Sequence, residues 1–83
     1  MAKIEKVKKT NSQRIERIFS LCKDHFGDVR FVGVKYHAKM GWISKVQFNG
    51  DYENLVAEGK DATDALRNLK NRVKKIIRRY NSV

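Results

Sequence analysis

The apolar residues near the end of the chain follow a helical period. Within residues 61–80 they recur in steps of one, three or four, which places them on one side of a helix of 3.6 residues per turn. They are Ala62, Ala65, Leu66, Leu69, Val73, Ile76, Ile77 and Tyr80. Asp61 stands where an N-cap is expected, and Asp64 adds a negative charge to the first turn, where the helix dipole favours anions. The pattern predicts a long amphipathic helix whose apolar side is buried.

A second helix is predicted over residues 12–26. Thr10 and Gln13 have the spacing of a capping box, and Asn11 or Ser12 are alternative caps. The apolar positions again share one side of a helix, and they are Ile15, Ile18, Phe19, Cys22 and Phe26. We expect this side to face the same core as the later helix.

The period changes to two after Gly27, which we expect to end the first helix in the left-handed conformation. Residues 29–37 are rich in β-branched and aromatic side chains and predict a strand. Val32, Val34 and Tyr36 would share one face of it. Val29 and Phe31 have the other parity, so either a bulge intervenes or the strand begins later.

The next stretch predicts a hairpin and a second strand. Residues 38–41 (AKMG) would form the turn, and residues 42–49 alternate as a strand. One face of that strand would carry Trp42, Ser44, Val46 and Phe48, and the other Ile43, Lys45 and Gln47.

A third strand is predicted over residues 52–58. The dipeptide Asn49-Gly50 is typical of a two-residue type I′ turn, which would connect the second strand to the third. Gly59 and Lys60 then lead directly into the cap of the final helix.

The expected architecture is therefore an α+β fold of order α-β-β-β-α. Two consecutive hairpins make a three-stranded antiparallel meander, and both helices can cover one face of it. We expect one domain over residues 12–83, preceded by a basic N-terminal arm over residues 1–11. The other sheet face would be exposed or used for binding, and it carries some of Lys35, His37, Ile43, Lys45 and Gln47.

Composition narrows the class of protein. The 83 residues allow one domain with a thin core, and 41% hydrophobic residues argue against wholesale disorder. A single cysteine excludes an intramolecular disulfide and fits a reducing compartment. The sequence has no apolar run of about 18 residues and no apolar centre of a signal peptide near Met1. We expect a cytoplasmic, soluble protein with no membrane association.

Net charge is the strongest compositional signal. The chain has 19 Lys and Arg against 9 Asp and Glu, a net charge of +10, which attracts polyanions and argues against a mimic of nucleic acid. From Arg67 to Arg79 there are seven cations and no acid, along the back of the predicted final helix. The candidate nucleic-acid-binding residues are Lys35, Lys39, Lys45, Lys60, Arg67, Lys70, Lys74, Lys75, Arg78 and Arg79.

Catalytic and metal-binding patterns are missing from the sequence. His25 and His37 are twelve residues apart, with no HxxH, CxxC or HExxH spacing and no phosphate-binding glycine loop. Cys22 lies in an apolar stripe, which favours a buried, unreactive thiol over a nucleophile. The place of Trp42 at the start of a strand favours a core residue. The alternative is a residue that stacks on a base or docks a partner. We expect no enzyme, no metal and no cofactor.

The element order, with Gly59-Lys60 before an Ala-rich final helix (EGKDATDAL, residues 58–66), resembles the double-stranded RNA-binding domain over roughly residues 12–80. In that family, lysines at the start of the last helix bind phosphates. The loop between the first two strands enters one minor groove, and the first helix contacts another. The resemblance implies that Lys60 stands for one such lysine, His37 or Lys39 for the loop contact, and Gln13 or Glu16 for the first-helix contact.

A shorter stretch, FNGDYENLVAEGKDATDALRNLKNRV, resembles the partial version of this fold in HicB-type antitoxins. Those proteins bind a partner protein, so the resemblance implies that the scaffold can serve protein binding.

Two functional hypotheses follow. The leading hypothesis is a small basic module that binds structured or duplex RNA or DNA mainly through phosphates. The alternative is a protein-binding module of phage or mobile-element type, such as an antitoxin or an inhibitor of a host nuclease or nucleoprotein complex, which recognises an acidic partner. Self-association as a homodimer is compatible with either.

Overall fold

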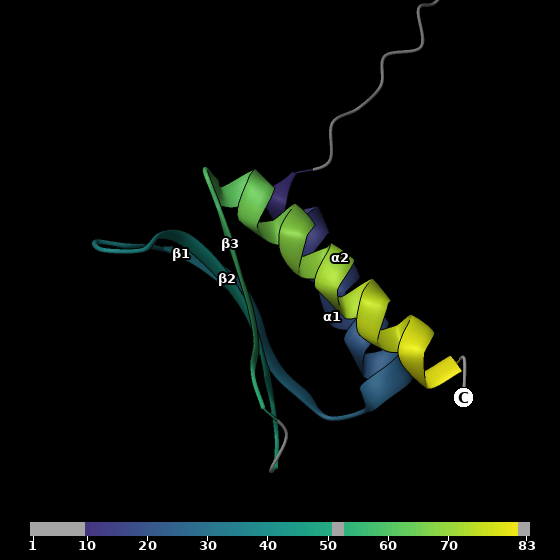
Figure 1. Ribbon diagram of the computed structural model, residues 1–83. Coiled ribbons are helices and arrows are strands. Elements are labelled where there is room, and N and C mark those ends of the chain that lie inside the picture. Colours follow the sequence, from purple (N-terminus) through teal and green to yellow (C-terminus); the bar gives the residue numbers. More distant parts are fainter. Residues whose placement is uncertain (1–9, 51–52, 82–83) are drawn as a thin grey trace, which may run out of the picture.

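The computed structural model describes residues 10–50 and 53–81, which form an α+β fold of the predicted order. Its elements are α1 (Asn11–Phe26), β1 (Val29–His37), β2 (Gly41–Phe48), β3 (Leu55–Gly59) and α2 (Ala62–Asn81). The strands make one antiparallel sheet of order β1-β2-β3, and both helices lie on the same side of it (Figure 1). Neither described helix is long and apolar enough to cross a membrane. The predicted basic arm lies, up to residue 9, outside the described residues.

Local sequence signals set both ends of α1. The Thr10 hydroxyl oxygen accepts a hydrogen bond from the Gln13 backbone N–H (3.1 Å), and the Gln13 side chain accepts one from the Thr10 backbone N–H (2.9 Å). The predicted capping box is thus confirmed. Gly27 ends the helix as expected, but its φ of 89° and ψ of −119° differ from the left-handed helical conformation that we predicted. That region is open to glycine because it has no Cβ.

Strand pairing confirms the predicted faces of β1 and β2. Val32 pairs with Val46 and Val34 pairs with Ser44, so these four side chains point toward the helices. The register shifts between Val29 and Phe31, which is the bulge that the change of parity allowed.

The connection between β2 and β3 differs from the prediction. β2 ends at Phe48 and β3 begins only at Leu55, and Asn49 does not have the positive φ that a type I′ turn requires. The two-residue turn is therefore wrong, and the third strand begins three residues later than predicted. A two-residue turn would pair each residue of β2 with a residue of β3 that lies two positions earlier than its observed partner. Because side chains alternate between the two faces with a period of two, this shift leaves every side chain on its predicted face.

Close packing of β3 against α2 explains this register. It places Gly59 opposite Trp42, at a point where a Cβ on residue 59 would overlap the backbone of Ala65. The register of a two-residue turn would put Ala57 opposite Trp42 instead. Tertiary contact thus overrides the local turn signal.

The start of α2 is capped by its two acids. The Asp61 carboxylate accepts a hydrogen bond from the Asp64 backbone N–H (2.8 Å), so the predicted N-cap is confirmed. Asp64 in turn accepts a hydrogen bond from the Lys60 backbone N–H (3.0 Å). Both carboxylates are thus occupied by backbone donors.

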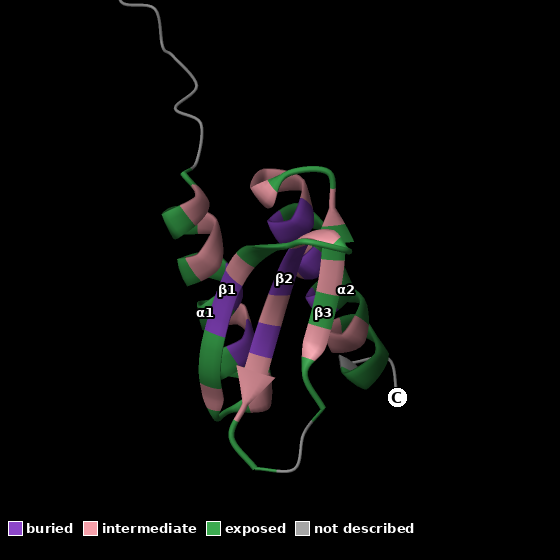
Figure 2. Ribbon diagram, turned by 90° about the vertical axis from the view of Figure 1, so that its left-hand side faces the viewer, coloured by how far each residue is buried: buried purple, intermediate pink, exposed green. Residues whose placement is uncertain are grey.

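The two helices run parallel over the sheet. At their starts the Thr63 hydroxyl donates to the Asn11 side chain (3.1 Å), and at their ends the rings of Phe26 and Tyr80 meet edge to face, 6.1 Å apart. The buried positions lie where helices and sheet meet (Figure 2). The core consists of Ile18, Cys22, Val32, Val46, Leu66, Leu69 and Val73.

Ser44 is the one buried polar side chain among the described residues. Its hydroxyl oxygen lies 2.6 Å from the Ala65 carbonyl oxygen in α2 and 3.2 Å from that of Ala57 in β3. A buried hydroxyl must have a partner, and this bond ties the centre of the sheet to α2.

Candidate nucleic-acid interface

The basic residues of α2 form two flanks with different neighbours. The flank toward α1 contains Arg67 and Lys70, and the 100° step per residue continues it through Lys74 and Arg78. The other flank borders the edge of β3, because the Arg72 guanidinium donates to the Val56 carbonyl (3.3 Å). Asn68 donates similarly to the Glu58 carbonyl (2.7 Å), and Lys75 and Arg79 extend this flank. The predicted cationic back of the helix is thus divided between two surroundings.

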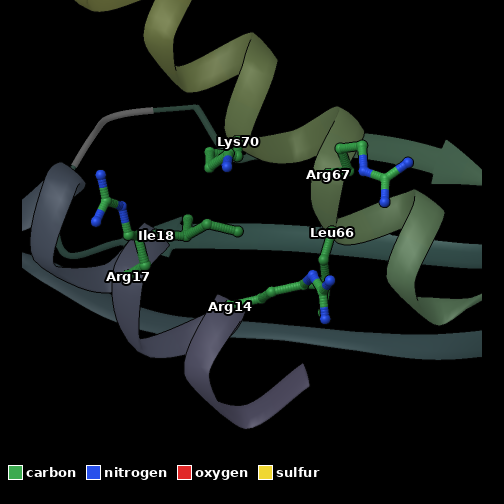
Figure 3. A pocket seen from close by; sticks show the side chains of 6 residues that line it. All are labelled: Arg14, Arg17, Ile18, Leu66, Arg67 and Lys70. Carbon is green, nitrogen blue, oxygen red and sulfur yellow. The ribbon is translucent and has the colours of Figure 1, made fainter. Parts of the chain in front are cut away.

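α1 adds two cations to the first flank. Arg14 and Arg17 lie across from Arg67 and Lys70, and the four surround a hollow of about 110 Å³ between the helices (Figure 3). The floor of the hollow is apolar and consists of Ile18 and Leu66, both almost fully buried. We call these six residues the basic groove. No acidic side chain is among the described residues that line it.

The cations of the basic groove interact more strongly with a ligand than cations spread over an open surface would. An apolar floor lowers the local dielectric and screens less than water does, so each cation acts more strongly on a ligand in the groove. Arg17 and Arg67 are exposed, whereas Arg14 and Lys70 are half-buried. The arrangement suits a small, doubly coordinated anionic group such as a phosphate, which guanidinium groups bind in a bidentate manner.

The basic groove is confined to the first half of α1. Asp24 lies seven residues after Arg17, which places it on nearly the same side of the helix, two turns closer to its end. Its negative charge offsets the cations there. The cationic part of the interhelical surface therefore lies near Arg14 and Arg17.

The remaining candidate lysines lie elsewhere. Lys35 and Lys45 sit on the face of the sheet that points away from the helices, so they do not extend the flanks of α2. Lys39 is in the turn of the β1–β2 hairpin, and Lys60 precedes α2. The structure thus unites Arg67, Lys70, Lys74 and Arg78 with two arginines that sequence reasoning did not select, and separates the lysines of the sheet from them.

Two of the residues suggested by the double-stranded RNA-binding domain, Gln13 and His37, have local structural roles. Gln13 completes the capping box, and the His37 Nδ1 accepts hydrogen bonds from the backbone N–H groups of Lys39 (3.2 Å) and Met40 (3.3 Å). At the start of α2, where that family is basic, the Asp61 carboxylate accepts from the Asp64 backbone N–H and the Asp64 carboxylate accepts from that of Lys60. Two carboxylates there repel phosphate, so this end of α2 is unsuited to the phosphate contact of the family.

Cys22 and Trp42 are accounted for by packing. Burial raises the pKa of the Cys22 thiol from 9.0 to about 11, which keeps it protonated and unreactive. Trp42 is half-buried and meets the Tyr36 ring edge to face, with ring centroids 5.4 Å apart. Among the described residues, no group of three or more His, Cys, Asp or Glu side chains could hold a metal ion.

Comparison with known proteins found no matching family model, and no significant match among curated proteins or solved structures. The family resemblances of the sequence therefore remain predictions.

Proposed function

We propose that this protein is a small nucleic-acid-binding module that holds RNA or DNA by its phosphates. The observation that supports the proposal is the basic groove, where two helices place Arg14, Arg17, Arg67 and Lys70 around one hollow with no acid among its described lining residues. Such a site favours an anion because a bound phosphate relieves the repulsion among neighbouring cations.

The flank of α2 beside the groove has the length to follow a strand. α-Helices rise about 1.5 Å per residue, so the backbone positions of Arg67 and Arg78 lie about 16 Å apart along the axis. Each strand of a duplex has one phosphate per about 3.4 Å of duplex axis, so a length of about 16 Å along that axis covers about five phosphates of a strand. Contacts of this kind are indifferent to base sequence.

Charge reversal in the groove tests the proposal. Anisotropy of labelled duplex RNA and DNA at about 100 mM salt should show that Arg17→Glu with Arg67→Glu weakens binding about 10- to 100-fold. The matched control is Lys23→Glu with Arg30→Glu, which changes the net charge equally at exposed positions that do not line the groove. We expect a loss below about 3-fold for the control. Equal losses of affinity in both variants would show that net charge alone causes the effect, and would contradict the proposed binding site.

A second candidate function is protein binding of phage or mobile-element type, including antitoxin or nuclease-inhibitor activity. One observation favours it: the β1–β2 hairpin extends away from the helices (Figure 1) and exposes Tyr36 and Met40, residue types common in protein interfaces. This function predicts a stoichiometric complex that survives nuclease, persists in Arg17→Glu with Arg67→Glu, and is lost in Tyr36→Ser with Met40→Ser. A complex that dissolves on nuclease treatment would instead point to bound nucleic acid.

A further inference from the structure

The face of the sheet opposite the helices has a composition of its own. Strand register places Phe31, Gly33 and Lys35 of β1 on this face, next to Ile43, Lys45 and Gln47 of β2. We call these six residues the open face. They line a shallow hollow of about 400 Å³, and Figure 2 looks onto this side of the sheet, with the helices behind it. The open face is therefore accessible without any movement of the helices.

Phe31 lies on the open face with much of its ring accessible. The far end of the ring covers Gly33, where a Cβ would overlap the ring atom Cζ, so the absence of a side chain at residue 33 makes room for the ring. Phe31 nevertheless remains 48% exposed. One part of the ring thus rests on the strand while the rest is available to a ligand.

Polar and cationic side chains stand next to the ring. Gln47 is directly opposite Phe31 in the pairing of β1 and β2, and Lys45 is opposite Gly33, the residue that the far end of the ring covers. Lys35 follows two residues along β1, opposite Ile43, which is only 9% exposed and extends the apolar floor. The set joins an aromatic ring with two cations and an amide that can both donate and accept hydrogen bonds.

We propose that the open face binds an unpaired base of single-stranded nucleic acid, which stacks on Phe31 while Lys35 and Lys45 hold the neighbouring phosphates. Aromatic stacking beside a cationic groove is how proteins bind single strands without reading sequence. In a duplex, the faces of each base are covered by its neighbours, so this surface selects single strands. The inference takes its ligand class from the proposed function but uses a surface on the other side of the sheet from the basic groove.

Charge favours an anionic ligand over a second copy of the chain. Two open faces in contact would bring together Lys35 and Lys45 of both copies, four cations against the two copies of Glu58, the acid paired with Ile43 on β3. A single strand instead supplies phosphates to both lysines and a base to the ring. Self-association through this face is one outcome that the test distinguishes.

Anisotropy of a fluorescein-labelled oligothymidylate and of a labelled DNA duplex tests the proposal on the full chain. Phe31→Leu keeps an apolar side chain but removes the ring, and should weaken oligothymidylate binding about 5- to 150-fold, the usual range for loss of one stacked base. Duplex binding through the basic groove should change less than about 2-fold. Phe31→Tyr should retain the single-strand affinity of the parent protein because the aromatic ring remains.

Phe19→Leu is the matched control, since Phe19 is another partly exposed phenylalanine, located on α1 outside the open face. It should leave both ligands unaffected. Thermal melts of all variants by circular dichroism verify folding, and quenching of 2-aminopurine in an oligonucleotide reports stacking independently of affinity. Oligothymidylate binding equal in Phe31→Leu and parent, or a dimer that is lost in Phe31→Leu, would overturn the inference. If the parent bound no nucleic acid, the proposed function would fail as well, whereas an unchanged duplex affinity with no Phe31 effect would sink this inference alone.

Discussion

The two outer surfaces of this domain are both cationic, but they are built differently. The helix layer presents the basic groove, where charged groups stand over an apolar floor of Ile18 and Leu66 with no aromatic side chain among the described lining residues. The open face presents Phe31 together with Lys35 and Lys45. Cations alone select phosphates, which every nucleic acid has, whereas an accessible ring adds selection for unstacked bases. Charge of one sign thus does not imply one ligand.

The largest expected effect is on stability, because unfolding abolishes the basic groove and the open face together. Leu69 is fully buried between the helices and the sheet, so Leu69→Ala should lower the free energy of unfolding by about 2–5 kcal/mol. Urea denaturation followed by circular dichroism measures the change. Asn71→Ala, an exposed position on the same helix, should stay within about 0.5 kcal/mol of the parent. Similar values for both variants would contradict the position of the core.

A smaller effect separates the two flanks of α2. Lys74 lies on the flank that continues the basic groove, and its neighbour Lys75 lies on the flank toward β3. We expect Lys74→Glu to weaken duplex binding about 5- to 10-fold and Lys75→Glu about 2-fold, because only the first position adjoins the proposed phosphate path. Anisotropy with one labelled duplex compares the pair. A stronger loss for Lys75→Glu would move the interface to the β3 side of the helix.

Gly33→Ala alters the open face with little change in stability. The new Cβ would displace the Phe31 ring, whose far end can swing away, so the free energy of unfolding should fall by less than about 1 kcal/mol. Oligothymidylate affinity should drop about as far as in Phe31→Leu, and the double variant should be no weaker than either single one. Additive losses would show that residue 33 does not act through the ring.

The effect of Cys22 on the pH dependence of stability should appear only at high pH. Burial raises the pKa of the folded thiol to about 11 from 9.0, so between pH 9 and 11 the unfolded chain loses this proton while the folded chain retains it. Stability therefore falls as pH rises through that window, and the fall should be shallower in Cys22→Ala. Urea denaturation of both proteins at pH 8, 9, 10 and 11 checks this, and parallel curves would contradict a buried, protonated thiol.

Most of the fold was predictable because local signals agree with the tertiary structure. Thr10 with Gln13 and Asp61 mark the starts of the helices, and the parity of β1 and β2 assigns their two faces. The turn at Asn49-Gly50 was not predictable from those two residues, because the register of β3 depends on its pairing with β2, where Gly59 lies opposite Trp42, and on its close packing against the start of α2.

The basic groove was half predictable. The helical period alone places Arg67 and Lys70 on one flank of α2. Arg14 and Arg17 were missed because their meaning depends on how α1 lies beside α2, which no single-helix pattern contains. A signal was present: the two arginines, three residues apart, stand beside the apolar stripe of α1, and a helix pair on one sheet face brings such positions together.

The salt dependence of duplex binding tests the phosphate-binding groove most directly. Anisotropy of a labelled DNA duplex between about 50 and 200 mM salt should give a slope of log affinity against log salt of about −3.6 if the four cations of the basic groove each meet a phosphate, and about −5.4 if Lys74 and Arg78 do so too. Arg17→Glu with Arg67→Glu should lower the magnitude of the slope by about 1.8 or more, while Lys23→Glu with Arg30→Glu leaves it nearly unchanged. Tight binding that salt does not weaken, or one slope for all three proteins, would contradict the proposal that the basic groove holds nucleic acid by its phosphates.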